Sequence, residues 1–419
     1  MNQSINIFWF RRDLRLEDNC GLFHALTSDT EINSTQVKKV LPIFIFDKEI
    51  LEKLPNDDAR VAFIHQQLEK IHHQLKEKGS ELSVYHGNPI TIFQELTKNY
   101  QIHSVFTNHD YESYATQRDQ EIQNYLASKN IEFKTYKDQV IFEKSEIVKQ
   151  DQTPYKVYTP YSKKWLEVFA TNGLQFYPSE EYLQNFIKTD DTHFLSLEDI
   201  GFFESSIKVE NYTVNSQFIE NYEATRNFPA QNSTSKLGSH LRFGTVSIRK
   251  IVFGANKSSN ITFLKELIWR EFFMQILWHF PHTVTQSFKP QYDNIQWRNN
   301  KEEFALWCKG KTGYPLVDAG MRELNATGFM HNRVRMLVGS FLCKHLLIDW
   351  RWGEAYFAEK LHDFELSSNV GNWQWVAGCG VDAAPYFRIF NPTTQIQKFD
   401  KNLEYVKKWV LDFQELTYP

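Results

Sequence analysis

Short apolar runs alternate with segments of helical period over the first third of the 419-residue chain. Five runs rich in β-branched and aromatic residues predict buried strands: residues 5–10, 40–46, 82–86, 104–108 and 131–136. Between the second and third runs, apolar residues recur at helical spacing from Val61 to Leu75, and the pattern stops at Gly79. Strands separated by helices predict an α/β domain built on a doubly wound parallel sheet.

The pattern changes twice after residue 136. Residues 137–204 are polar with scattered aromatic residues, so we predict an ordered but irregular interdomain connector. From residue 205 to the end at 419, helical periods dominate, as in 261–280 and 333–348, which predicts an all-α domain. The predicted domains are therefore residues 1–136, 137–204 and 205–419.

Charge is distributed unevenly along the chain. The formal net charge is -4, yet from residue 221 onward 24 Lys and Arg stand against 18 Asp and Glu. Nine of the 11 tryptophans also lie in this half. Basic side chains beside large aromatic rings favour a nucleic-acid-binding surface, so a phosphate-rich partner is expected there.

Composition limits the remaining classes of protein. No apolar run approaches the length of a membrane span and no leader-like segment opens the chain, so we expect a cytoplasmic protein with no membrane partner. The four cysteines are far apart and form no CxxC motif, so neither disulfides nor a bound metal are expected. His65, His72 and His73 lack carboxylates at metal-ligand spacing and are predicted to lie on a solvated helix face.

Two glycine motifs fail the test of their context. GKT at 310–312 lacks the glycine that a phosphate-binding loop places five residues earlier, where Ala305 stands. GCGVDA at 378–383 spells a dinucleotide-binding fingerprint, but such a loop follows a strand, and this one follows a helical region. We therefore predict no dinucleotide loop at either position.

Two pairs of residues, one acidic and aromatic and one of two tryptophans, indicate a binding site. Glu266 and Trp269 are three residues apart, so a helix would direct a carboxylate and a flat ring to the same side. Trp373 and Trp375 are two apart and would diverge by about 200° in a helix, one facing inward and the other outward. Each pair could also be ordinary core packing.

A third helical face lies in the motif MHNRVRM. Asn332, Arg335 and Met336 occupy positions i, i+3 and i+4 and would share this face, while Arg333 is turned away by about 100°. Packing with a buried ion pair would explain these residues equally well. Three such faces in one basic, tryptophan-rich domain nevertheless favour a functional site.

Several longer motifs follow one another in a familiar order. They are FWFRRDLRLEDN (8–19), TSKLGSHLRFG (234–244), ELIWREF, KTGYP, MHNRVRM, IDWRWGE, NWQWVAG and DAAPYFRIFNPTTQ. With these motifs the chain resembles the DNA photolyase/cryptochrome flavoprotein family, and most closely the class I photolyases that repair cyclobutane pyrimidine dimers. The resemblance implies an N-terminal α/β antenna domain and a C-terminal helical domain that binds FAD without a covalent bond.

The resemblance also implies flavin contacts. Arg335 and Asp363 would pair beside the flavin ring, with Asn332 close to the adenine. Asn369 would lie against flavin N5, where its carbonyl can accept a hydrogen bond from the protonated nitrogen and so favour reduced FADH⁻. Further cofactor contacts are implied for Tyr222, Thr234, Ser235, Lys236, Leu237, Ser239, Arg270 and Glu365.

By the same resemblance, the tryptophans divide into two groups. Trp297, Trp350 and Trp373 match a chain that carries electrons from the surface to the photoexcited flavin. Trp269 and Trp375 match the walls around a flipped pyrimidine dimer, with Glu266 on its base edge and Met336 and Asn332 beside it. The implied contacts to DNA phosphates are Arg270, Arg333, Arg388 and Lys398.

The resemblance implies a light-driven reaction on UV-damaged DNA: excited FADH⁻ gives an electron to the dimer, the cyclobutane ring splits, and the electron returns. A monomer is expected. Glu112 matches one contact to a folate antenna, which leaves methenyltetrahydrofolate, a deazaflavin or no antenna open. Asn372 stands where class I members usually have glycine and is expected to crowd a loop before Trp373. A blue-light receptor cryptochrome and a (6-4) photolyase remain the alternatives.

Overall fold

The computed structural model describes residues 4–28, 38–189 and 194–412. Two compact units are assembled from alternating parts of the chain. The α/β unit comprises Met1–Ile141, Gly173–Lys208 and His240–Phe253, and the helical unit comprises Phe142–Asn172, Val209–Ser239 and Gly254–Pro419. The domains predicted from the sequence are contiguous, and their boundaries at 136 and 204 stay a prediction.

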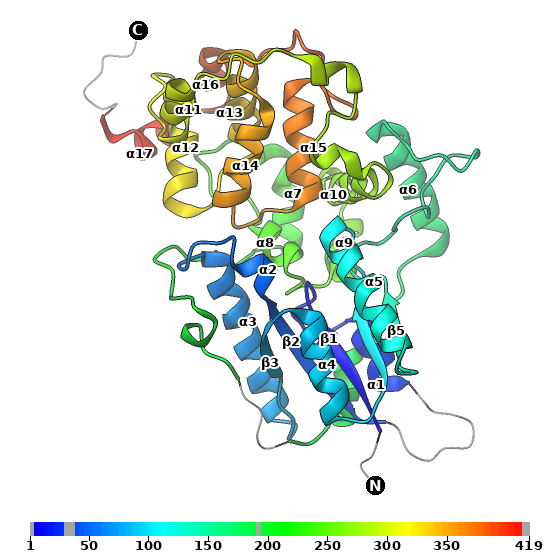
Figure 1. Cartoon of the computed structure of the whole chain (residues 1–419). Coiled ribbons are helices and arrows are strands. Elements are labelled where there is room, and N and C mark those ends of the chain that lie inside the picture. The colour runs from blue at the N-terminus through cyan, green and yellow to red at the C-terminus, as the bar shows by residue number, and fades with distance from the viewer. Residues whose placement is uncertain (1–3, 29–37, 190–193, 413–419) are drawn as a thin grey trace. The chain divides into compact units, whose positions relative to one another are not determined.

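The α/β unit contains one five-stranded sheet, and every strand pair in it is parallel (Figure 1). The strands are β1 (Ile5–Phe10), β2 (Val40–Asp47), β3 (Ser83–Gly87), β4 (Ile102–Asn108) and β5 (Glu132–Tyr136). Their order is β3-β2-β1-β4-β5, so the direction of winding reverses between β1 and β4. The predicted doubly wound parallel sheet is confirmed.

Helices cover both faces of this sheet. They are α1 (Cys20–Thr27), α2 (Lys48–Leu51), α3 (Ala59–Lys76), α4 (Pro89–Asn99) and α5 (Ser113–Ala127). Phe8 and Phe10 pack with residues of α1 and α3, whereas Ile7 and Trp9 pack with residues of α4 and α5. Because successive strand residues point to opposite faces, β1 is apolar throughout and divides its side chains between two cores.

The histidines of α3 correct one prediction. His65 and His72 are only 7% and 8% exposed, so the predicted solvated face is wrong for both. The ring of His65 lies 2.9 Å from the carbonyl oxygen of Leu195, and the ring of Phe194 packs against both histidines. A segment more than 100 residues away along the chain covers this face, and no local pattern reveals it.

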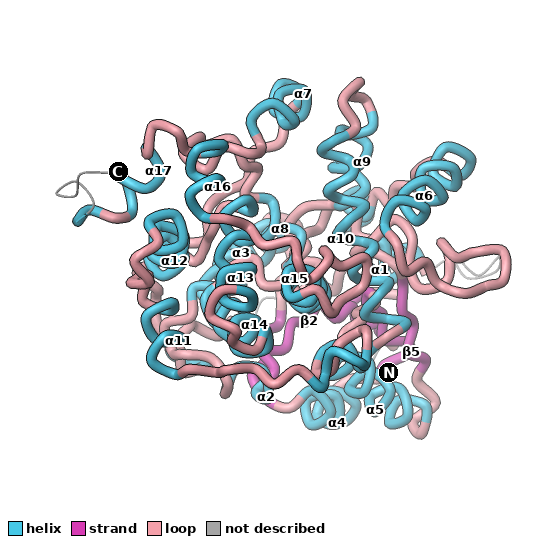
Figure 2. The backbone as a smooth tube through the Cα atoms, turned by 90° about the horizontal axis from the view of Figure 1, so that it is seen from above, coloured by secondary structure: helices cyan, strands magenta, loops and turns pink. Residues whose placement is uncertain are grey.

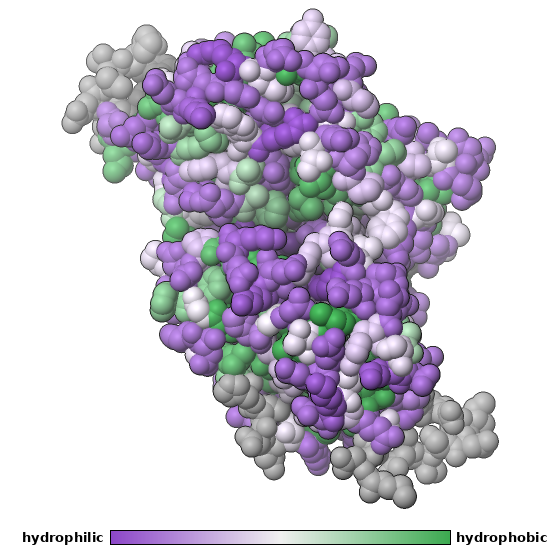
Figure 3. All heavy atoms as spheres, in the orientation of Figure 1, coloured by the Kyte–Doolittle hydropathy of each residue, from purple (hydrophilic) through white to green (hydrophobic). Residues whose placement is uncertain are grey.

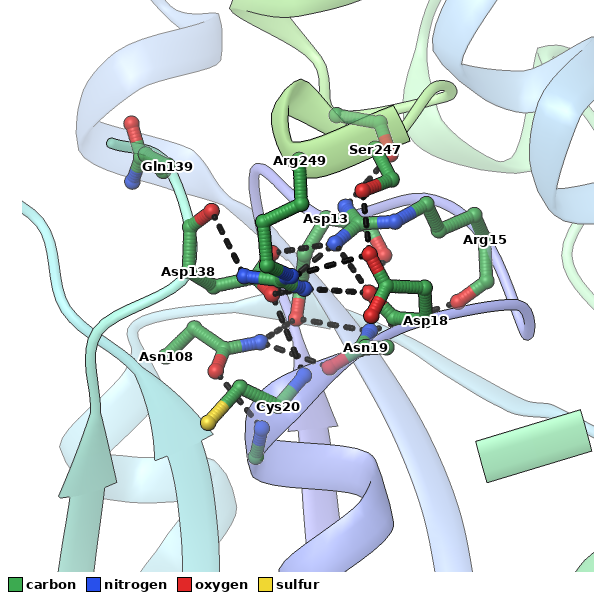
Figure 4. A network of polar contacts seen from close by, with 12 residues as sticks. Asp13, Arg15, Asp18, Asn19, Cys20, Asn108, Asp138, Gln139, Ser247 and Arg249 are labelled. Carbon is green, nitrogen blue, oxygen red and sulfur yellow. Dashed lines mark hydrogen bonds and ion pairs between the residues drawn. The ribbon is translucent and has the colours of Figure 1, made fainter. Parts of the chain in front are cut away.

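A polar network follows β1 and includes residues of the motif FWFRRDLRLEDN (Figure 4). Asp138 accepts hydrogen bonds from Arg15 at 2.7 Å and from Arg249 at 2.8 Å, and Arg249 also binds Asp18. Burial raises the pKa of Asp138, but the two guanidinium groups oppose this effect and lower the pKa to about 2. Through Arg249, the network joins residues 240–253 to the loops at the end of the sheet.

The helical unit consists of short and medium helices joined by turns. They are α6 (Tyr158–Asn172), α7 (Ser216–Thr225), α10 (Thr262–His279), α11 (Lys301–Cys308), α12 (Pro315–Thr327), α13 (Asn332–Lys344), α14 (Trp350–Lys360), α15 (Leu366–Ala377), α16 (Pro392–Phe399) and α17 (Glu404–Trp409). Helices α8 (Leu237–Arg242) and α9 (Ile248–Asn256) include the points where the chain passes between units. Helix α15 contacts α10, α13 and α14 (Figure 2).

Helix α6 was not foreseen in the stretch predicted to be irregular. Its buried residues Tyr158, Tyr161, Trp165 and Phe169 are spaced three or four apart, which is a helical period. Trp165 donates a hydrogen bond to the buried carboxylate of Glu271 on α10 at 2.7 Å. The surrounding polar residues obscured the period, although the signal was present.

The surface gives no sign of a membrane segment among the described residues. None of their helices combines the length and hydropathy needed to cross a bilayer, and no cluster of three metal-ligating side chains occurs among them. On the face drawn in Figure 3, hydrophilic side chains predominate and hydrophobic ones form small groups.

Candidate functional site

Helix α15 carries the residues on which the site is built. Glu365 caps its N-terminus by accepting a hydrogen bond from the Ser368 amide at 3.0 Å, and Gly378 ends it with a φ of 93°. The fingerprint GCGVDA therefore starts at the C-cap of a helix and follows no strand. Trp373 is 3% exposed and Trp375 half-buried, and the two line different cavities, as their predicted divergence requires.

The first cavity, here called the ring cavity, has a volume of about 100 Å³. The site residues around it are Asn332, Arg335, Met336, Asp363, Glu365, Asn369 and Trp373. Arg335 and Asp363 form the predicted pair, with two parallel hydrogen bonds of 3.1 and 2.9 Å. This fork geometry fixes both side chains at the edge of the cavity.

The amide of Asn369 has a defined orientation in the ring cavity. Its Nδ2 donates to the backbone oxygen of Glu354 at 3.1 Å and to the Glu354 carboxylate at 2.8 Å. A backbone carbonyl can only accept, so the nitrogen must face Glu354, and Oδ1 remains as an acceptor. Burial raises the pKa of Glu354, and the hydrogen bond from Asn369 opposes that rise.

The second cavity, the phosphate cavity, has a volume of about 320 Å³. The predicted residues Tyr222, Thr234, Ser235, Lys236, Leu237 and Ser239 all line it. Lys236 lies 3.1 Å from Glu210 and 3.2 Å above the ring of Phe329. Gly238 is required here, because a Cβ atom would come within 2.7 Å of the Asp363 side chain.

The third cavity, the aromatic cavity, also has a volume of about 320 Å³. Its lining includes Arg226, Glu266, Trp269, Arg270, Met336 and Trp375. Tyr158 stacks against Trp269 with centroids 3.6 Å apart and an interplanar angle of 6°. The carboxylate of Glu266 is paired with Arg226. A supported flat ring and a restrained carboxylate thus lie on one side, as the spacing of Glu266 and Trp269 predicts.

The three cavities share their walls. Asn332 lines all of them, and Arg335 and Asp363 line both the ring and phosphate cavities. Asn372 lines the ring and aromatic cavities, but it lies within α15, so the predicted loop before Trp373 is wrong. Its side chain donates to the Ser368 carbonyl at 2.8 Å, one turn earlier.

The tryptophans predicted to carry electrons differ in burial. Trp350 and Trp373 are 1% and 3% exposed, and half-buried Trp297 packs against the same hydrophobic cluster. Fully buried Trp307 packs edge-on against Trp373, and the centroids of the two rings lie 6.2 Å apart. The guanidinium of Arg351 lies 4.7 Å from the centre of the Trp350 ring. Of the three, Trp297 is the one that reaches the surface, and the electron-carrying role of the three tryptophans stays a prediction.

The predicted phosphate contacts lie in different environments. Arg270 lines the aromatic cavity, while Arg333 is half-buried, donates to Asn227 and lies 4.5 Å over Phe399. Arg388 and Lys398 are exposed. Tyr386 and Phe387, beside Arg388, are 71% and 72% exposed, so this loop presents aromatic rings together with a positive charge.

Glu112, the predicted antenna contact, has partners within the α/β unit. Its carboxylate accepts from Arg12 at 3.0 Å and from Arg242 at 2.6 Å. Both arginines lie in motifs quoted above, so the acid has a structural role in joining them. Whether it also contacts an antenna stays a prediction.

Sequence reasoning missed three residues that support the site: Arg226, Glu354 and Tyr158. Arg226 and Tyr158 lie outside the recognised motifs and meet Glu266 and Trp269 only in the folded chain. Glu354 lies within the quoted motif IDWRWGE, and its position there was the one available signal.

The residues present fit FAD. The phosphate cavity offers hydroxyls and a lysine for the diphosphate, and the adjoining ring cavity combines an orientated amide with an arginine-carboxylate pair. The family model "FAD binding domain of DNA photolyase" matches residues 263–418, and the "DNA photolyase" model matches residues 6–180.

Relatives match nearly the whole chain. A deoxyribodipyrimidine photo-lyase of Halobacterium salinarum is 33% identical over 435 residues, covering 98% of this chain and 90% of the relative. A photolyase from Sulfolobus tokodaii, solved with two FAD molecules, has a TM-score of 0.83 and 34% identity over 99% of this chain and 91% of its own. The cryptochrome of Synechocystis has a TM-score of 0.84 and 26% identity over 99% of this chain and 90% of its own. The chain belongs to the DNA photolyase family.

Proposed function

We propose that this protein is a deoxyribodipyrimidine photolyase that uses light to split cyclobutane pyrimidine dimers in DNA. The carrying observation is the junction of the aromatic and ring cavities at Asn332 and Met336. A substrate in the aromatic cavity and a flavin ring in the ring cavity would be separated by few side chains. Such proximity is what electron transfer between them needs.

The aromatic cavity suits a flipped dinucleotide. Trp269, held from behind by Tyr158, and Trp375 would provide apolar walls for the two bases. Glu266 would accept a hydrogen bond from a base edge, and its pairing with Arg226 holds the carboxylate in place. A dimer stacks poorly in duplex DNA, so its flipping costs less than that of intact pyrimidines.

The ring cavity positions the cofactor. FAD, bound in its reduced form, would supply the light absorption and the electron that opens the cyclobutane ring. The Oδ1 atom of Asn369 would accept a hydrogen bond from N5, because Glu354 holds the amide nitrogen on the other side. Arg335 would contribute positive charge beside the flavin while Asp363 fixes its orientation.

The basic residues would hold the DNA backbone. Arg270, Arg333, Arg388 and Lys398 are the proposed phosphate contacts, and the exposed rings of Tyr386 and Phe387 would face the strand beside the lesion. Binding through phosphates predicts affinity that falls steeply with salt. We propose a monomer in the cytoplasm that acts on UV-damaged DNA.

A binding assay in the dark tests the proposed substrate. The protein is titrated into an oligonucleotide with and without one thymine dimer, and the Trp269→Ala variant is compared. Trp278 supplies the matched control, because it lies on the same helix but stacks with Lys144 instead of lining the cavity. We expect Trp269→Ala to lose the preference for the dimer and Trp278→Ala to keep it. If Trp269→Ala and Trp278→Ala showed the same preference for dimer-containing DNA, the result would contradict the proposed pocket.

A blue-light receptor cryptochrome is the second candidate, favoured by the likeness to the Synechocystis protein. It would retain flavin photoreduction but show no light-driven recovery of intact thymines. A (6-4) photolyase would leave cyclobutane dimers intact. The antenna chromophore stays open, since Glu112 already binds two arginines and a folate would have to compete with them.

A further inference from the structure

Gln374 lies between the two tryptophans of the site and faces neither of their cavities. Successive residues of a helix are turned by about 100°, so Trp373, Gln374 and Trp375 point in three directions. Trp373 lines the ring cavity and Trp375 the aromatic cavity. Gln374 is 2% exposed and points toward the segment that follows α10.

The Gln374 amide makes three hydrogen bonds to backbone groups. Its Nε2 donates to the carbonyl oxygens of Thr283 at 2.8 Å and Gln286 at 3.0 Å, and its Oε1 accepts from the Phe288 amide at 2.8 Å. These partners are backbone groups, so their donor and acceptor roles cannot change. Rotation of α15 about its axis would break all three hydrogen bonds of this buried side chain together.

The packing on the same face leaves α15 little freedom. Ser367, Gly371 and Gln374 are spaced i, i+4 and i+7, and they line a cavity of only about 10 Å³ against α10. A Cβ atom on Gly371 would lie 2.2 Å from the ring of Phe273, so the two helices approach as closely as glycine permits. Contact at Gly371 and hydrogen bonds at Gln374 therefore fix both the distance and the rotation of α15.

We propose that Gln374 is a positioning residue that sets the rotation of α15, so that Trp373 and Trp375 reach their separate cavities at the same time. The inference rests on the proposed function for the meaning of those cavities. With side chains about 5–6 Å from the helix axis, a rotation of about 20° would move both rings by about 2 Å in opposite senses relative to their partners. One substitution would thus disturb both dimer binding at Trp375 and flavin photoreduction through Trp373.

The substitution Gln374→Met keeps the length of the side chain and removes all three hydrogen bonds. We expect dimer-specific affinity and the rate of flavin photoreduction to fall together, each by about tenfold. Trp375→Ala should lower only the affinity, and Trp373→Phe only the photoreduction. The matched control is Gln275→Met. Gln275 is a 5% exposed amide on α10 whose Nε2 donates to the Ile147 carbonyl oxygen at 2.6 Å, and it lines neither tryptophan cavity. Gln275→Met should reduce the folded fraction, but the folded molecules should keep both the dimer affinity and the rate of photoreduction.

The variant Gln374→Glu tests the positioning role through pH, with affinity measured per folded molecule so that loss of fold does not enter. Protonated, the acid can still donate to one carbonyl and accept from Phe288; ionised, it faces two carbonyl oxygens. Dimer affinity of Gln374→Glu should fall as pH rises through the acid's raised pKa, while the wild-type affinity stays level over the same range. A wild-type profile for this variant, or losses in Gln374→Met that match Gln275→Met per folded molecule, would overturn the proposal.

The near-ultraviolet circular dichroism of the tryptophans separates this inference from the proposed function. We expect the spectrum to change in Gln374→Met and to stay like wild type in Gln275→Met, whatever the substrate is. A wild-type protein that ignores the dimer would contradict the proposed function only. An unchanged tryptophan spectrum in folded Gln374→Met would contradict the positioning role.

Discussion

Replacing Asn369 by aspartate would place a second carboxylate against Glu354. The amide now donates to both the backbone oxygen and the side chain of Glu354, at 3.1 and 2.8 Å. An ionised carboxylate at this position cannot donate, so Asn369→Asp turns two attractive contacts into repulsive ones unless a proton is bound. Burial already raises the pKa of Glu354, which favours protonation of the new pair.

The size of the effect follows from the geometry. Two carboxylate charges about 4 Å apart repel by about 4 kcal/mol at an effective dielectric constant of about 20, which corresponds to about three pKa units. The pair should therefore hold one shared proton well above the pH at which an unfolded aspartate ionises. The folded state then binds more protons than the unfolded state, so stability falls as pH rises from about 4 and levels off above the raised pKa. At neutral pH we expect the free energy of unfolding of Asn369→Asp to lie about 3 kcal/mol below that of the wild type.

Urea unfolding of wild type and variant across this pH range measures the loss. Asn372→Asp is the matched control, because Asn372 lies on the same helix, is exposed and binds only the Ser368 carbonyl in the described structure. It should change the free energy of unfolding by no more than about 0.5 kcal/mol at any pH. A pH-independent loss in Asn369→Asp, or equal losses in both variants, would refute the argued contact with Glu354.

Four further predictions test other parts of the structure. Asp138→Asn should destabilise the protein by about 3–5 kcal/mol in urea, because Arg15 and Arg249 would lose the carboxylate between them. Glu266→Gln should weaken dimer binding by about tenfold in a fluorescence titration, with intact DNA bound as before. Trp350→Phe should slow flavin photoreduction in a flash experiment while repair by already reduced protein continues; equal loss of both would contradict the proposed electron path. Four phosphate contacts predict that DNA affinity falls by about 100-fold for a fourfold rise in salt.

The sheet was predictable because its signal is local. The residues of β1 and β2 are mostly apolar and are buried on both faces of the sheet, which is the pattern expected of central parallel strands. Helix α6 shows the limit of prediction from local patterns, because its buried aromatic residues recur at helical spacing but lie among polar residues that obscure the period. The burial of His65 and His72 depends on residues near 195, which no window of sequence includes.

The site was predictable to the extent that its residues belong to contiguous motifs. Glu266 and Trp269, or Trp373 and Trp375, are related by helical spacing alone, and the cavities confirm those relations. Arg226 was not predicted because it pairs with Glu266, which lies 40 residues away along the chain and comes close only in the folded protein. Gln374 escaped because its partners are backbone groups, which carry no residue signature.

The central claim is that light absorbed by this protein repairs a dimer held in the aromatic cavity. The most direct test is to illuminate the reduced protein with an oligonucleotide containing one thymine dimer and to follow the return of thymine absorbance. We expect recovery in the light, none in the dark, and strongly reduced recovery in Trp269→Ala at subsaturating protein. Absence of recovery from wild-type protein that binds FAD and photoreduces it normally would contradict the account.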